Sequence, residues 1–210
     1  MKIRPITPRV HGWLETKLPN KIIEHLWDCI ETARGERWNK HLVGHIEKSF
    51  KIEDKNDIFW KEVLLPHLNH YGQTFNHDHT KIPMDGKYET YLDTLWVNYQ
   101  NKHEFNPLHK HSGVFSFVIW LKIPYEYEEQ SKLPFLDGTL EKRPGNFEFQ
   151  FLDGYGNIGN YQYNLGKECE GRMLFFPSKL MHLVHPFFET DETRISISGN
   201  LKFTFYYDVG

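Results

Sequence analysis

The second half of the chain is built from short runs of aromatic and β-branched residues separated by Gly, Pro and Asn. Runs of this kind, bounded by turn residues, are typical of β-strands. We expect strands over residues 95–99, 114–123, 146–152, 160–164, 172–176 and 194–207. Six to eight such strands predict a mainly β fold, a double-sheet jelly roll of the cupin-like, double-stranded β-helix type.

The first third of the chain has a helical pattern instead. Residues 19–32 place Ile22, Leu26 and Ile30 on one face, as an amphipathic helix does. A second helix is expected over residues 56–73, with Pro66 as a kink. We therefore predict one domain over residues 1–210, in which residues 1–91 form a helical support and residues 92–210 form the jelly-roll core.

Length, charge and cysteine content restrict the class of protein further. A chain of 210 residues fits one domain with a substantial core, and 25 Lys and Arg against 28 Asp and Glu give no bulk attraction to nucleic acid or to an anionic membrane. The two cysteines, Cys29 and Cys169, do not suggest a disulfide framework. No signal peptide and no apolar run of membrane-spanning length are found. We expect a soluble protein of the cytoplasm, or of the host cytoplasm if it is viral, and the oligomeric state stays open.

Histidines provide the candidate metal ligands. His109 and His111 precede an apolar run over residues 114–121, and because side chains alternate along a strand, both imidazoles can converge on one metal ion. His182 follows far downstream and is preferred over His185 as a third ligand. His77 and His79 have the same spacing as the first pair, but they lie in a polar stretch without a following apolar strand, so we interpret them as surface residues.

The order His-x-His, distal His and Arg-x-Ser resembles that of the Fe(II)- and 2-oxoglutarate-dependent oxygenases, especially the prolyl-hydroxylase-like branch and its small phage-type relatives. The resemblance covers residues 92–203. It implies that His109, His111 and His182 bind Fe(II), and that Arg194 binds the far carboxylate of 2-oxoglutarate. It also implies that O2 is a cosubstrate, that 2-oxoglutarate is converted to succinate, and that a substrate is hydroxylated.

Four further residues are candidates for contact with 2-oxoglutarate. Tyr99 and Trp120 stand where the prolyl-hydroxylase pattern has tyrosines near the cosubstrate. Ser196 lies on the same face of its expected strand as Arg194 and can add a hydroxyl donor. Ser116 completes this group. For Tyr99, Ser116 and Trp120 the alternative is a packing role in the core or cavity wall.

One position departs from the resemblance, because His111 replaces the carboxylate that usually completes the iron site. Imidazole also suits zinc, copper and nickel, so a three-His zinc hydrolase or lyase is one alternative. That alternative leaves Arg194 and Ser196 unexplained. A non-catalytic jelly-roll binding protein is the other alternative.

The substrate is not identified by any motif. By analogy with the family, a protein side chain such as proline is favoured as the partner of the enzyme. The polar stretch over residues 125–143 is long for a connection between strands, and we expect it to be a mobile lid or substrate loop.

Overall fold

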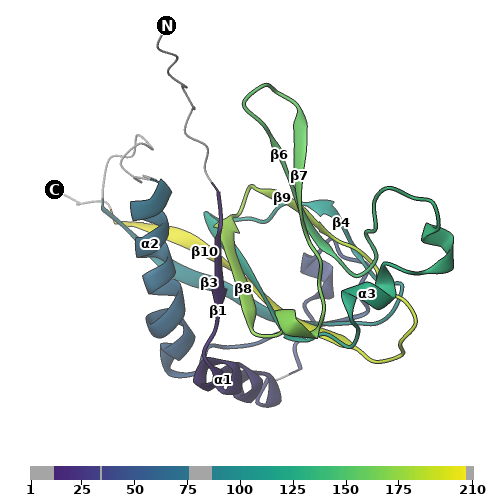
Figure 1. The fold of residues 1–210 in the computed structure, drawn as a ribbon. Helices are drawn as coiled ribbons and strands as arrows, with labels where there is room; N and C mark the ends of the chain where they lie inside the picture. Colours follow the sequence, from purple (N-terminus) through teal and green to yellow (C-terminus); the bar gives the residue numbers. More distant parts are fainter. Residues whose placement is uncertain (1–11, 34, 76–86, 207–210) are drawn as a thin grey trace, which may run out of the picture.

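The computed structural model describes residues 12–33, 35–75 and 87–206. In these ranges the chain is mainly β, and its strands form two antiparallel sheets that face each other as a double-stranded β-helix, or jelly roll (Figure 1). This confirms the predicted fold class. The larger sheet has the order β1-β8-β5-β10-β3-β2 and the smaller has the order β4-β9-β6-β7. The strands are β1 (Leu14–Lys17), β2 (Lys48–Lys51), β3 (Lys87–Gln100), β4 (Asn106–His109), β5 (Phe115–Lys122), β6 (Phe147–Leu152), β7 (Ile158–Tyr163), β8 (Arg172–Pro177), β9 (Met181–Val184) and β10 (Arg194–Tyr206).

Two helices lie along the outer side of the larger sheet (Figure 1). The first is α1 (Asn20–Glu31), which agrees with the amphipathic pattern and buries Ile22 and Leu26. The second begins with a 3-10 turn, η2 (Lys55–Asp57), continues as a π turn, η3 (Trp60–Leu64), and ends as α2 (Leu65–Phe75). Pro66 lies at the start of α2 and has no N–H to donate, so the departure from α geometry in the preceding turn agrees with the expected kink.

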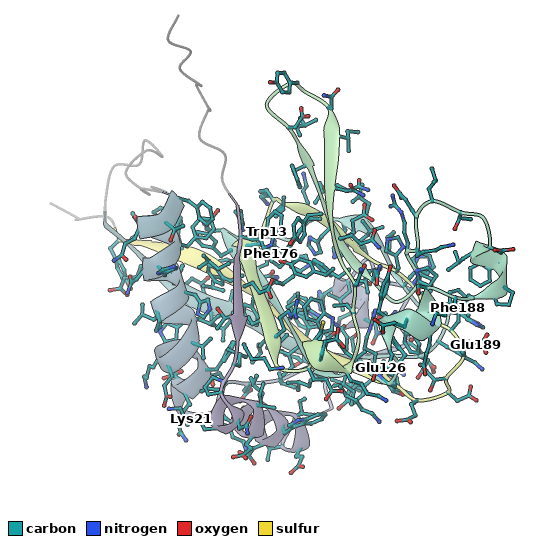
Figure 2. All side chains as sticks on the ribbon, viewed as in Figure 1. Trp13, Lys21, Glu126, Phe176, Phe188 and Glu189 are labelled. Atoms are coloured by element: carbon teal, nitrogen blue, oxygen red, sulfur yellow. The ribbon has the colours of Figure 1, made fainter. Side chains whose placement is uncertain are left out.

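The core has two parts, one on each face of the larger sheet. β5 shows why, because seven of its eight residues are buried. Phe117 and Ile119 pack toward the helices, whereas Val118 and Trp120 pack between the two sheets. A strand covered on both faces has a continuous apolar run, as this sequence has. Figure 2 shows side chains filling the space between the sheets, with Phe176 of β8 among them.

The N-terminal third also contributes strands to the larger sheet. β1 pairs with β8 at one edge, and β2 pairs with β3 at the other. This differs from the purely helical support expected for residues 1–91. Each of the two strands has only four residues, too few for a periodic pattern to stand out from the surrounding sequence.

No helix among the described residues is long and apolar enough to cross a membrane.

The segment expected to be a lid is folded against the body of the protein. It contains a short helix, α3 (Tyr127–Gln130), and a 3-10 turn, η5 (Pro134–Leu136). Gln130 is buried, and its side-chain amide both donates to and accepts from the backbone of Phe188, at 2.8 Å in each case. Leu133 and Leu136 are also buried. The segment is thus attached to the connection between β9 and β10, and its mobility stays a prediction.

Strand alternation positions the site. β10 pairs with β3 on one side and with β5 on the other. Its even-numbered residues, beginning with Arg194 and Ser196, face the space between the sheets, and its odd-numbered residues, such as Ile195 and Ile197, face the helices. The same strand therefore supplies polar groups to the interior cavity and apolar groups to the helix-side core.

Candidate metal and cosubstrate site

A cavity of about 530 Å³ opens between the two sheets. It brings together most of the residues singled out from the sequence. The cavity wall includes His109, His111, His182, Arg194, Ser196 and Trp120. A single cavity therefore contains the three candidate metal ligands and the candidate carboxylate-binding arginine.

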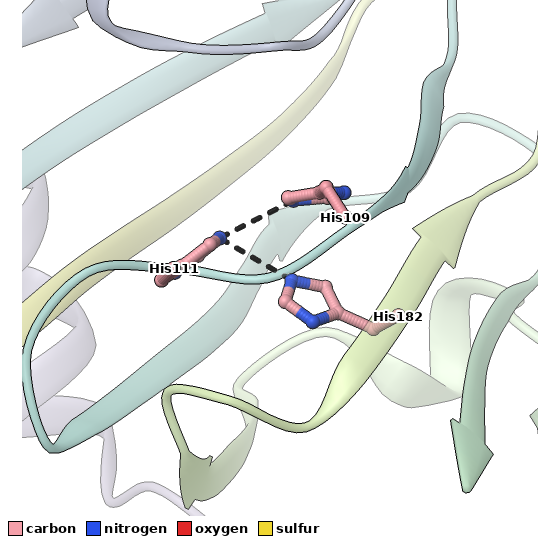
Figure 3. A group of neighbouring side chains, drawn as sticks. All are labelled: His109, His111 and His182. Atoms are coloured by element: carbon pink, nitrogen blue, oxygen red, sulfur yellow. Dashed lines mark hydrogen bonds between the residues drawn. The ribbon is translucent and has the colours of Figure 1, made fainter.

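The three histidines converge through their Nε2 atoms (Figure 3). His111 Nε2 lies 3.3 Å from His109 Nε2 and 3.3 Å from His182 Nε2. Strand pairing explains part of this arrangement, because His109 of β4 is directly opposite His182 of β9. His111 follows β4, and its backbone N–H donates to Ser178 O at 2.8 Å.

A glycine turn carries the chain from His111 into β5. Gly113 has a φ of 90°, a conformation that side-chain-bearing residues rarely adopt. A Cβ at this position would lie 2.4 Å from Leu201 O of β10. The turn therefore requires glycine both for its backbone conformation and for its close approach to β10.

Hydrogen bonds at the opposite side of each ring fix where the protons lie. His109 Nδ1 is 2.7 Å from Pro107 O, and His182 Nδ1 is 2.9 Å from Leu180 O. A carbonyl oxygen can only accept, so both Nδ1 atoms carry the proton and both Nε2 atoms present a lone pair. This is the tautomer that a metal-binding histidine needs when it binds through Nε2.

The third ring has the same tautomer. His111 Nδ1 lies 3.0 Å from Asn200 Oδ1, which also accepts from the Ser116 hydroxyl at 2.8 Å. An amide oxygen accepts, so His111 Nδ1 donates and its Nε2 is left without a proton. The lone pair of His111 Nε2 therefore faces those of His109 and His182, each 3.3 Å away, and a cation between the three nitrogens would remove the repulsion. The donor set therefore fits a divalent metal ion.

Burial keeps all three rings neutral. Desolvation lowers the pKa of His109, and the same effect together with the neighbouring His109 lowers the pKa of His111 to about 3. The pKa of His182 also lies well below its ordinary value, first because of burial and then because of the two neighbouring histidines. Neutral imidazole is the form that binds metal, so protons compete weakly at this site.

Arg194 is a buried cation without an acidic partner among the described residues. Its side chain is 1% exposed. The guanidinium donates to the Tyr125 hydroxyl, to Gly145 O at 2.7 Å and to Gln100 Oε1 at 2.5 Å, which are all neutral acceptors. A buried charge is costly unless an opposite charge compensates it. Because Arg194 lines the cavity, a bound carboxylate can supply that compensation.

The other residues expected to contact the cosubstrate divide into two groups. Ser196 and Trp120 line the cavity, and their contact with 2-oxoglutarate stays a prediction. Ser116 is fully buried behind His111, and its hydroxyl contacts His111 Nδ1, Asn200 and Ser178 rather than the cavity. The expected contact of Ser116 with 2-oxoglutarate is therefore wrong. The Ser116 hydroxyl is placed to hold the His111 ring instead.

Tyr99 lies on the other face of the larger sheet. It pairs with Ile195 and packs with Phe50 in the helix-side core, 6.1 Å between ring centroids. Its neighbours Asn98 and Gln100 face the cavity instead. The expected contact of Tyr99 with 2-oxoglutarate is therefore corrected, because alternation turns the ring away from the site.

The preference for His182 over His185 agrees with the geometry. His185 Nε2 lies 3.3 Å from Glu148 Oε2, and His185 does not line the cavity. Its backbone N–H donates to Asn146 O at 2.9 Å. The surface interpretation of His77 and His79 concerns residues outside the described ranges.

Sequence reasoning missed several residues of the site. Gln100 and Tyr125 hold the guanidinium of Arg194, and Asn200 holds His111. Gln100 is directly opposite Arg194 in the pairing of β3 with β10, so a known register would have indicated it. Tyr125 comes from a connection and has no local signal. Asn106 Oδ1, in the cavity wall, is a buried acceptor without a hydrogen-bond partner in the structure.

Comparison with known proteins places the chain in a class of enzyme. Residues 94–200 match the family described as "Putative 2OG-Fe(II) oxygenase". The match covers half of the chain, and the chain belongs to this family of 2-oxoglutarate- and Fe(II)-dependent oxygenases. It is thus a dioxygenase, for which the family implies Fe(II), 2-oxoglutarate and O2. No curated protein matches the chain.

Solved structures with a similar outline include three prolyl hydroxylases. A Pseudomonas putida prolyl-4-hydroxylase is 12% identical with a TM-score of 0.49, covering 91% of this chain and 92% of its own. The viral collagen prolyl hydroxylase of Paramecium Bursaria Chlorella virus-1 is 12% identical with a TM-score of 0.48, covering 90% and 94%. A Trichoplax adhaerens prolyl hydroxylase, in complex with a hypoxia inducible factor peptide, is 10% identical with a TM-score of 0.49, covering 94% and 84%.

Proposed function

We propose that this dioxygenase is a hydroxylase that binds Fe(II) through the Nε2 atoms of His109, His111 and His182. The observation that carries the proposal is the convergence of three unprotonated Nε2 atoms in the cavity that also contains the uncompensated Arg194 cation. Iron with 2-oxoglutarate supplies oxidative chemistry that couples loss of CO2 to insertion of one oxygen atom into a substrate C–H bond. The protein supplies the position of the groups and the exclusion of water.

Arg194 binds the far carboxylate of 2-oxoglutarate in this proposal. The guanidinium is planar and can form two parallel hydrogen bonds to a carboxylate. Gln100 and Tyr125 hold the guanidinium in place through neutral contacts, so they fix its orientation without neutralising its charge. Ser196 and Trp120 line the cavity on the adjacent strands β10 and β5, where they are directly opposite each other.

The substrate proposed is a protein side chain, with peptidyl proline as the leading candidate. The cavity is also lined by the aromatic residues Trp38 and Trp96, which can pack against a ring or an aliphatic side chain. We also propose that residues 1–210 act as one oxygenase domain.

The zinc hydrolase alternative makes a different use of the same ligands. Three histidines with an open position are a common catalytic zinc site. That function leaves Arg194 as a buried cation in the cavity with no reason to be there. The requirement for Fe(II) and O2 distinguishes the two functions, because an oxygenase needs both whereas a zinc hydrolase needs neither.

The test is succinate formation from 2-oxoglutarate by the purified protein with Fe(II), in air and under nitrogen. We expect succinate only with O2 and Fe(II), at a rate raised by a peptide substrate that gains one oxygen atom by mass spectrometry. His182→Ala should abolish this activity, and His185→Ala serves as the matched control. Succinate formation that is independent of O2, or a fully active His182→Ala variant, would overturn the proposal. If succinate formation is stimulated only by a non-peptide substrate, the proposed substrate is wrong, but the assignment as an oxygenase stands.

A further inference from the structure

A second group of potential metal ligands lies outside the cavity, where α1 meets the connection that follows β2. Its members are His25, Cys29 and Asp54, and one ligand atom of each lies within 4.8 Å of the other two. None of the three lines the cavity that contains His109, His111 and His182. The mechanism proposed above makes no use of them.

The local structure explains why these side chains meet. His25 and Cys29 are four residues apart on α1, so they lie on the same face of the helix, one turn apart. Asp54 precedes the helical segment that starts at η2. Its carboxylate accepts from the backbone N–H groups of Phe59 at 3.0 Å and Trp60 at 2.7 Å. The carboxylate is thus held in place by the next helix while it faces α1.

Two of the three separations are close to those around tetrahedral zinc. His25 Nε2 lies 2.9 Å from Asp54 Oδ1 and 3.5 Å from Cys29 Sγ. Zinc bonds of about 2.0 Å to nitrogen or oxygen and about 2.3 Å to sulfur place neighbouring ligand atoms about 3.3 to 3.6 Å apart at tetrahedral angles. The sulfur–nitrogen separation already fits, and the nitrogen–oxygen separation needs only a slight increase.

The group is buried, and one of its members borders a second cavity. The side chains of His25 and Asp54 are 9% and 5% exposed, and Cys29 is buried. Cys29 also lines a separate cavity of about 290 Å³, whose wall includes the carboxylate residues Glu36 and Glu53. Of the three ligand residues, Cys29 alone lines this cavity, so a fourth ligand would lie on the Cys29 side of the group.

Two lysines border the same cavity, and both are engaged elsewhere. Lys55 Nζ is 2.6 Å from Asp28 Oδ2. Lys51 Nζ lies 5.8 Å from the centre of the Trp38 ring, as in a cation–π contact. Neither ammonium group is paired with a member of the cluster, so the Asp54 carboxylate is free of a competing lysine.

We propose that His25, Cys29 and Asp54 form a zinc site, with the fourth position facing the small cavity. A thiolate, an imidazole and a carboxylate are all common zinc ligands. When the ion binds, the Cys29 thiol loses its proton to solvent and the Asp54–His25 hydrogen bond is replaced by two bonds to the metal. The ion would link α1 to the segment that leads into α2, and so fasten together the two helices that cover the larger sheet.

Cobalt is the probe for this site, because a thiolate bound to Co(II) gives a near-ultraviolet charge-transfer band that histidine ligands do not give. Metal-free full-length protein is titrated with Co(II), and then with Zn(II) to displace it. We expect the band to appear in the wild type and in His182→Ala, and to disappear on addition of zinc. Cys29→Ala should remove the band, whereas Cys169→Ala, which removes the other buried thiol, should keep it.

His25→Gln provides a variant that leaves the thiol in place. We expect it to weaken cobalt binding at this site by tenfold or more while the circular dichroism spectrum stays that of the wild type. Absence of the band in the wild type overturns the proposal, as does a band that persists in Cys29→Ala. Because the three-His site contains no thiol, neither result bears on the oxygenase assignment.

Discussion

Replacing Arg194 by Gln tests the reasoning about the buried cation most directly. The guanidinium is 1% exposed and donates only to neutral groups, so the far carboxylate of 2-oxoglutarate would be its anionic partner. Removing one member of a buried, hydrogen-bonded charge pair costs about 2 to 5 kcal/mol. Since about 1.4 kcal/mol corresponds to a tenfold change, the Kd for 2-oxoglutarate should rise by roughly 30-fold to several thousand-fold.

Isothermal titration calorimetry of the metal-bound protein under nitrogen measures this change. Pyruvate is the informative second ligand, because it keeps the keto acid group and lacks the far carboxylate. The wild type should prefer 2-oxoglutarate strongly, and Arg194→Gln should bind the two ligands almost equally. Arg194→Lys should recover only part of the preference, because an ammonium group cannot form the two parallel hydrogen bonds.

Arg172→Gln is the matched control. Arg172 lies on β8, outside the cavity, and pairs with Glu15 at 3.2 Å on a partly exposed surface. Its replacement should leave both ligand affinities unchanged. If Arg194→Gln keeps the wild-type preference for 2-oxoglutarate over pyruvate, then Arg194 does not bind the far carboxylate, and the argument from the uncompensated charge is refuted.

The three-His site gives further predictions. His182→Ala should lose bound iron, measured by metal analysis after desalting, whereas His185→Ala should retain it; the reverse result would exchange their roles. Asn200→Leu removes the acceptor that fixes the His111 tautomer and should weaken metal binding by about 10- to 100-fold, with an unchanged affinity contradicting the tautomer argument. In the metal-free protein, His111 alone should account for a loss on the order of 2 kcal/mol of unfolding free energy between pH 7 and pH 5, because unfolded His111 takes up a proton near pH 6.5 while the folded ring has its pKa lowered to about 3. Urea titrations at the two pH values check this, and His111→Gln should show a smaller loss.

Several strands with long apolar or alternating runs are predicted well, whereas β3 was expected only over residues 95–99 of its full length. β5, β6, β8 and β10 begin within one residue of the expected positions, because their apolar or alternating runs are long. The short strands β1, β2, β4 and β9 were not expected. Each has four residues, and each is held by pairing with a partner that is distant in the sequence. Such pairing leaves little local signal.

The ligands were easier to find than the groups that hold them. The His109-x-His111 spacing is a local feature, and it predicted the convergence of two rings correctly. Whether a residue of β3 faces the cavity depends on its register with β10, and the two strands are far apart in the sequence, with Tyr99 paired to Ile195. Tyr99 was assigned to the wrong face for this reason, and Gln100 beside it was overlooked.

The alternation along β10 has a consequence for which sequence changes this enzyme can accept. Its even-numbered residues line the cavity and its odd-numbered residues pack under the helices, so a substitution at one position can alter the chemistry of the site or the packing of the core separately. Inserting or deleting one residue before Arg194 could shift β10 by one position along its neighbours. The side chains facing the cavity and those facing the helices would then change places, with Ile195 and Ile197 in the cavity and the Arg194 guanidinium among apolar side chains. Divergence in this strand should therefore proceed by replacement at constant length, while changes in length collect in the connections, such as the tip of the β6–β7 hairpin that extends from the body (Figure 1).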